Sequence, residues 1–136
     1  MKPIKIFSIL LMLCLGIATA ATAQPAAVKK AANTTFTLTT FDAKGSILST
    51  SNGVFVSNNG ICVSTWKPFV GAMKAEVTDN NGQKYSVETI LGANELYDVA
   101  KFKITAKTNA ALFAPSVVAN SAAWIVMPSQ AGAPIK

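Results

Sequence analysis

Short stretches in which hydrophobic and polar residues alternate, separated by turn residues, run through positions 34–128. The stretch 99–104 (VAKFKI) alternates most clearly and places Ala, Phe and Ile on one face, as a half-buried strand does. Asn-Gly pairs at 59–60 and 81–82 predict tight hairpin turns, because they supply the positive φ angles that such turns need. We expect strands at 35–41, 46–50, 53–56, 61–64, 75–78, 84–91 and 99–104, and further candidates at 116–119 and 124–127. This pattern predicts an all-β fold, either an antiparallel β-barrel or a sandwich.

Little of the pattern favours helix. Residues 69–74 (FVGAMK) fit at most a single helical turn. Residues 24–33 (QPAAVKKAAN) have no periodicity, so we expect a flexible leader there. We interpret residues 92–95 and 105–115 as connections, and residues 129–136 as a tail after a single domain at 34–128.

The first 23 residues have the features of a secretory signal peptide. Lysines precede an apolar run, and Ala21-Thr22-Ala23 forms a small-x-small cleavage signal before Gln24. The apolar run is shorter than the ~20 residues of a membrane span, so no transmembrane anchor is expected. Cys14 offers an alternative as a lipidated residue, but Leu13 stands where that motif has a small residue. We therefore expect export across the Ala23/Gln24 cleavage site to the periplasm or the cell exterior.

Charge and cysteine content exclude several classes of function. The formal net charge is +6, yet every positive side chain is a lysine, and arginine forks are the usual readers of bases and phosphates. No nucleic-acid partner is expected. After cleavage Cys62 is the single cysteine, and the sequence has no histidine, so neither an internal disulfide nor a structural zinc site can form. Cys62 lies in an apolar strand pattern and is expected to be a buried, inert thiol, and we expect neither a metal nor another cofactor.

Four segments in order resemble the Deg (high-temperature-requirement) group of bacterial trypsin-like serine proteases. They are the glycine-opened strand, turn and strand at 53–64 (GVFVSNNGICVS), the later Gly71-Ala72, the hairpin at 76–85, and the segment 98–104 (DVAKFKI). Residues 121–126 are similar to the last strand of that family's first barrel. The resemblance covers about residues 45–128 and implies the N-terminal barrel of a fold made of two six-stranded β-barrels. It implies that Asp98 stands at the position of the catalytic acid and Lys67 at that of the catalytic histidine.

The chain departs from this family in two ways. A Gly-x-Ser-Gly-Gly stretch for the nucleophile is not found, and the serines of the chain do not match the position of a nucleophile. The base is a lysine, which is protonated near neutral pH because its ordinary pKa is ~10.4, whereas histidine has a pKa of ~6.5. Burial would be needed to make Lys67 a base, and a neighbouring carboxylate would oppose that change. We therefore interpret Lys67 as a solvated or salt-bridged lysine, with a catalytic role as the alternative.

The other candidate residues each have a structural alternative. Asp98 either acts as the catalytic acid or caps the turn into its own strand. Trp66 borders the expected cleft beside Lys67, where it either packs in the core or stacks on a substrate or other ligand.

Three hypotheses about function follow. The first is an exported serine protease-family domain that is catalytically inactive, a pseudo-protease that binds or scaffolds a peptide or protein. The second is the N-terminal fragment of a longer serine endopeptidase, whose nucleophile lies beyond residue 136 and whose partner is a second β-barrel. The third is an unrelated small secreted β-barrel with a ligand cavity.

Overall fold

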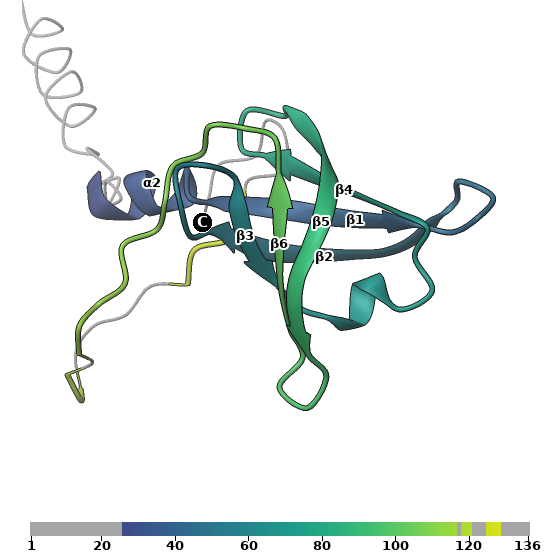
Figure 1. The fold of residues 1–136 in the computed structure, drawn as a ribbon. Coiled ribbons are helices and arrows are strands. Elements are labelled where there is room, and N and C mark those ends of the chain that lie inside the picture. The colour runs from purple at the N-terminus through teal and green to yellow at the C-terminus, as the bar shows by residue number, and fades with distance from the viewer. Residues whose placement is uncertain (1–25, 117, 121–124, 129–136) are drawn as a thin grey trace, which may run out of the picture.

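Six antiparallel strands close into a barrel in the order β1-β2-β3-β6-β5-β4 (Figure 1). The structure is a computed structural model, and it describes residues 26–116, 118–120 and 125–128. The strands are β1 (Thr35–Phe41), β2 (Ile47–Phe55), β3 (Ile61–Ser64), β4 (Lys74–Asp79), β5 (Lys84–Asn94) and β6 (Val99–Ile104). The predicted all-β fold is confirmed, and of the two predicted architectures it is the barrel.

The barrel interior is filled by inward-facing side chains at alternate positions along the strands. Buried and partly exposed positions alternate strictly along β1, and buried and exposed positions do so along β6. The ring of Phe36 lies at the centre, 4.8 Å from the ring of Phe55 and 5.9 Å from that of Phe102. The buried core consists of Phe36, Leu38, Phe55, Cys62, Ala75, Val77, Ala100, Phe102 and Ile104.

Gly53 explains why a glycine opens the motif at 53–64. A Cβ atom at this position would lie 2.3 Å from the Phe36 ring and 2.6 Å from the Val63 carbonyl oxygen. Strand β2 therefore approaches the core and strand β3 too closely for any side chain at this point.

Two strand predictions were wrong in their extent. The strands predicted at 46–50 and 53–56 form one strand, β2, because Ser51 and Asn52 pair with Leu38 and Thr37 of β1. Strand β5 continues to Asn94, through most of the connection predicted at 92–95, and shifts register twice along β6. Such bulges change which face a side chain takes, and periodicity alone does not reveal them.

The flexible leader predicted at 24–33 was also wrong, because helix α2 (Ala26–Ala32) occupies most of it. Alanine and lysine favour helix, and burial of Val28 and Ala32 supplies the tertiary contacts that so short a helix needs. The hydroxyls of Thr34 and Thr35 donate to the carbonyls of Ala31 and Ala32 at 2.7 Å and satisfy the end of the helix.

The helical turn predicted at 69–74 lies earlier in the chain, as the 3-10 helix η1 (Lys67–Phe69), and Lys74 already belongs to β4. Pro68 favours this position, because its fixed φ suits the first turn of a helix.

The final strand candidates are not borne out where the structure describes them. Residues 116 and 118–119, and residues 125–127, are not in strands. The barrel instead closes by pairing β4 directly with β1. Residues 117 and 121–124, the predicted signal peptide 1–23 and the tail 129–136 lie outside the described residues. Within the described part of the chain, no helix is long and apolar enough to cross a membrane.

Candidate functional site

Asp98 lies at one end of the barrel, in the last position of the turn between β5 and β6. Strand β3 pairs with β6 there, with Ser64 opposite Ala100, so the residues that follow β3 come to lie beside Asp98. One carboxylate oxygen, Oδ1, accepts hydrogen bonds from the backbone N–H groups of Trp66 at 2.9 Å and Lys67 at 2.8 Å. Asp98 thus ties the β5–β6 turn to the segment between β3 and β4.

These two N–H groups begin the 3-10 helix η1, where backbone donors have no partner within the helix. Trp66 occupies the N-cap position without a side-chain acceptor, and Asp98 supplies the acceptor from another segment. The alternative role, a cap on its own turn, falls to the backbone of Asp98, whose N–H donates to the Glu95 carbonyl at 3.3 Å, while its carboxylate holds the start of η1. Asp98 also has a φ of +52°, a left-handed conformation that aspartate tolerates better than most residues.

Lys67 meets Asp98 through its backbone and not through its ammonium group. The side chain is exposed, and no carboxylate of a described residue forms an ion pair with it. The structure therefore brings together Asp98 and Lys67, the pair to which the resemblance points, but leaves the lysine side chain in water.

Trp66 links this turn to the core. Its ring stacks on the ring of Phe69 at 6.0 Å with an interplanar angle of 20°, and Phe69 in turn packs edge-on against Phe102 at 5.2 Å. The indole Nε1 is buried and finds no hydrogen-bond acceptor among the described residues. Trp66 is therefore at least in part a packing residue, which is one of the two roles expected for it.

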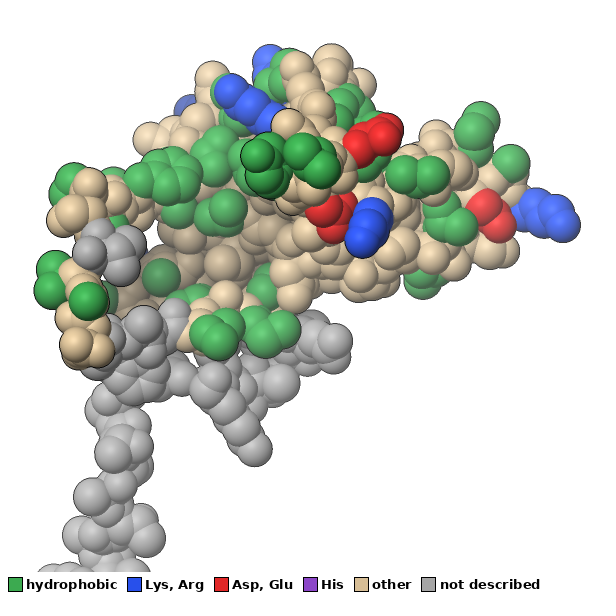
Figure 2. Space-filling view, turned by 90° about the horizontal axis from the view of Figure 1, so that it is seen from below, with side chains coloured by type: hydrophobic (Ala, Val, Ile, Leu, Met, Phe, Trp, Pro, Cys, Tyr) green, Lys and Arg blue, Asp and Glu red, His purple; other side chains and the backbone are tan. Residues whose placement is uncertain are grey.

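Apolar side chains flank the site on two loops, a feature that the sequence pattern did not single out. Leu96 and Tyr97 come just before Asp98, Val70 and Met73 follow η1, and all four are exposed. Figure 2 looks at the molecule from below the β5–β6 hairpin of Figure 1 and shows hydrophobic side chains in several separate groups on this face. The available signal was the presence of large hydrophobic residues in short segments between predicted strands, Val70 and Met73 at 69–74 and Leu96 and Tyr97 just after 92–95.

Two further residues of the sequence analysis have structural roles in the barrel. Ser64, next to the site, is buried and donates its hydroxyl hydrogen to the Asn52 carbonyl at 2.7 Å. Cys62 is buried as predicted, and burial raises the pKa of its thiol from 9.0 to about 12. A thiol that holds its proton so strongly is a poor nucleophile and a poor metal ligand. Among the described residues no group of histidine, cysteine and acidic side chains is arranged to hold a metal.

Comparison with known proteins identifies the fold. No protein-family model matches the sequence, and no curated protein matches it. Among solved structures, the chain is similar to the crystal structure of the serine endoprotease from Yersinia pestis, with a TM-score of 0.54 and 25% sequence identity over 59% of this chain. The match spans only 28% of the endoprotease chain. The barrel is therefore of the trypsin-like kind, in agreement with the resemblance seen in the sequence.

Proposed function

We propose that this chain is an exported, protease-related domain that does not cleave peptide bonds and instead binds a peptide or protein segment beside Asp98. The observation that carries the proposal is the position of Lys67. The resemblance puts Lys67 at the position of the base, and the Asp98 carboxylate accepts a hydrogen bond from the Lys67 backbone N–H at 2.8 Å, so this lysine is held by its main chain.

The chemistry of the base argues against proton transfer at this position. The base of a serine protease takes the serine proton and later returns it, which an imidazole can do near neutral pH. A lysine does so only where burial removes water from its ammonium group. Lys67 is exposed, so a serine brought to this site would keep its proton.

The surroundings of the site favour binding. Leu96 and Tyr97 directly precede Asp98 and are exposed, and Lys67, whose backbone Asp98 holds, is exposed as well, so the surface around Asp98 offers both apolar contacts and a positive charge. Extended peptides with apolar and acidic side chains fit this combination, and the solved structure with a similar barrel is an endoprotease, a protein that acts on polypeptides.

The test measures binding and cleavage in one sample. The full protein that contains this chain is titrated with fluorescent peptides from denatured casein, and the peptides are then weighed by mass spectrometry. We expect saturable binding, intact peptides, and binding about three- to tenfold weaker for Lys67→Glu, because reversing a charge at the rim of a contact has an effect of this size. Lys44→Glu, at an exposed lysine in the β1–β2 turn, is the matched control and should bind as the unmodified protein does. Cleaved peptides, or equal weakening by both substitutions, would overturn the proposal.

A second candidate is the N-terminal part of a longer serine endopeptidase, with the serine beyond residue 136 and a second β-barrel as its partner. The observation in its favour is that the match spans only 28% of the Yersinia endoprotease chain, so in that protein the similar segment is one part of a larger whole. This candidate requires Lys67, or a residue from elsewhere, to act as the base. It therefore predicts that the full protein hydrolyses the casein peptides.

A further inference from the structure

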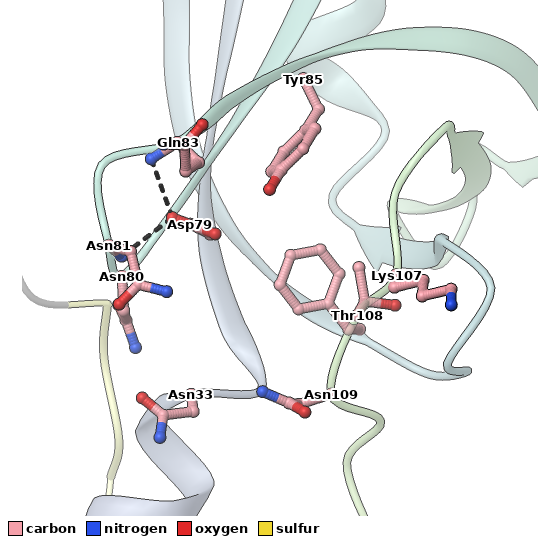
Figure 3. A pocket seen from close by; sticks show the side chains of 10 residues that line it. Asn33, Asp79, Asn80, Asn81, Gln83, Tyr85, Lys107, Thr108 and Asn109 are labelled. Atoms are coloured by element: carbon pink, nitrogen blue, oxygen red, sulfur yellow. Dashed lines mark hydrogen bonds between the residues drawn. The ribbon is translucent and has the colours of Figure 1, made fainter.

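A polar pocket of about 290 Å³ lies at the opposite end of the barrel from Asp98. Three segments that are distant in sequence form most of its walls (Figure 3): the hairpin from Asp79 to Tyr85, Asn33 after helix α2, and residues 107–109 after β6. Phe55, the last residue of β2, also lines it. The side chains of Asn33, Asn109 and Tyr85 border the same hollow in that view.

Hydrogen bonds fix these walls before any ligand arrives. Asp79 Oδ1 accepts from the backbone N–H groups of Asn81 at 2.8 Å and Gln83 at 2.9 Å, which holds the turn. Thr108 donates its hydroxyl hydrogen to the Ser57 carbonyl at 2.6 Å and accepts from the Gly60 N–H at 3.2 Å, which holds the third segment. The side-chain amide of Asn80 donates to the carbonyl of Ala32, the last residue of α2, and so joins the turn to the helix. A pocket with fixed walls loses little entropy when it binds a small molecule.

The groups that face the hollow are mostly uncharged amides and a phenol. The lining contains five side-chain amides, from Asn33, Asn80, Asn81, Gln83 and Asn109. Within the described part of the chain, the side chains of Asn33 and Asn109 and the hydroxyl of Tyr85 make no hydrogen bond. Each amide has donors and an acceptor, and the phenol both donates and accepts. The charged lining residues are Asp79 and Lys107, on opposite sides of the hollow (Figure 3), and they balance one another.

We propose that this pocket binds a neutral saccharide. Sugar hydroxyls both donate and accept hydrogen bonds, and the amides and the phenol of the pocket can do the same. The ring of Tyr85 adds an apolar surface beside its hydroxyl, which suits a sugar ring with one polar edge and one C–H face. The volume lies near the lower end of the roughly 300–1,000 Å³ of small-molecule pockets, so one or two sugar units fit.

Other ligand classes fit this pocket less well. The balanced charge of Asp79 and Lys107 gives no strong attraction for an anion or a cation. Among the described lining residues, only Phe55 and the ring of Tyr85 offer apolar surface, so an apolar ligand would leave the amides without partners.

The experiment follows the backbone and side-chain amide signals of the ¹⁵N-labelled full chain by NMR while glucose, N-acetylglucosamine or cellobiose is added. Concentrations up to about 20 mM are needed, because a few neutral hydrogen bonds give millimolar affinity. We expect at least one of these sugars to shift the side-chain signals of Asn33 and Asn109 in a saturable way. Each of the substitutions Asn33→Ala, Asn109→Ala and Tyr85→Phe should weaken binding about fivefold, the effect of one lost neutral hydrogen bond.

Asn52→Ala is the matched control, because Asn52 is an exposed asparagine on β2 outside the pocket. Its affinity for the sugar should equal that of the unmodified chain. A neutral peptide, trialanine amide, is the competing probe. The proposal is overturned if no sugar shifts these signals, if only the peptide does, or if the pocket variants bind the sugar as tightly as Asn52→Ala. None of these results bears on the Lys67 site, whose peptide binding is tested separately at the other end of the barrel.

Discussion

Substitutions at Asp98 test how the candidate site is held together, because they separate the contribution of the carboxylate's hydrogen bonds from that of the left-handed backbone conformation. The carboxylate accepts two backbone hydrogen bonds at the start of η1, and the backbone of Asp98 has a φ of +52°. Loss of a helix-capping acceptor costs about 0.5–2 kcal/mol, and a left-handed conformation costs a residue such as alanine about 1–2 kcal/mol. Asp98 is partly exposed, so we take values in the lower half of each range.

Three variants then form a graded series. Asp98→Asn keeps an acceptor and tolerates the positive φ, so it should lower the free energy of unfolding by less than about 1 kcal/mol. Asp98→Gly loses the acceptor but adopts the conformation freely, for a cost of about 1 kcal/mol. Asp98→Ala suffers both effects, for a total of about 2 kcal/mol.

Urea denaturation of the full chain, followed by tryptophan fluorescence, measures the series. The difference between the alanine and glycine variants reports the backbone conformation, and the difference between glycine and asparagine reports the cap. If Asp98→Ala is no less stable than Asp98→Asn, the carboxylate does not hold the Lys67 turn and the described site geometry is wrong.

Three further predictions concern the barrel and its leader. Gly53→Ala should lower the free energy of unfolding by about 2–3 kcal/mol, because its Cβ would lie 2.3 Å from the Phe36 ring. Gly45→Ala is the control, since its Cβ has open space and it should lose only about 1 kcal/mol for its φ of +80°. Similar urea midpoints for the two variants would contradict this packing. The pKa of the Cys62 thiol is about 12 in the folded protein and about 9.0 when unfolded, so above pH 9 only the unfolded state loses this proton, and stability falls as pH rises toward 12. At about pH 10 this loss is ~1.4 kcal/mol, and urea titrations at several pH values should find it absent in Cys62→Ala. Val28→Ser should cost about 1–2 kcal/mol in the same assay if α2 is docked, whereas a cost near zero, equal to that of the exposed Ala27→Ser, would mean that the leader is free after all.

The parts of the fold that could be predicted are those in which local chemistry decides the structure. The alternation at 99–104 identified Ala100, Phe102 and Ile104 as one face, and all three are fully buried. The Asn59-Gly60 pair located a hairpin turn, and Gly60 has the expected positive φ of 84°. Both signals depend only on neighbouring residues, so they can be seen in a single sequence.

The parts that could not be predicted depend on partners distant in the chain. Ser51 and Asn52 look like a break because they are polar, and only their pairing with β1 makes them part of one long strand. Helix α2 has a single large hydrophobic residue, Val28, and no local pattern reveals that it is buried. At the site, the resemblance indicated Asp98 and Lys67 as a pair. Asp98 contacts the backbone N–H of Lys67 and not its ammonium group. The cause is the pairing of β3 with β6, because the turn that follows β3 then brings this N–H to the carboxylate.

The most direct test of the proposed function is fluorophosphonate labelling of the full protein that contains this chain, since this reagent reacts with an activated serine. We predict no labelling, because the resemblance puts a lysine, Lys67, at the position of the base, and its side chain is exposed. Labelling of the native protein that disappears in Lys67→Ala and persists in Lys44→Ala would contradict the account. It would establish Lys67 as a working base and the chain as part of an active serine endopeptidase.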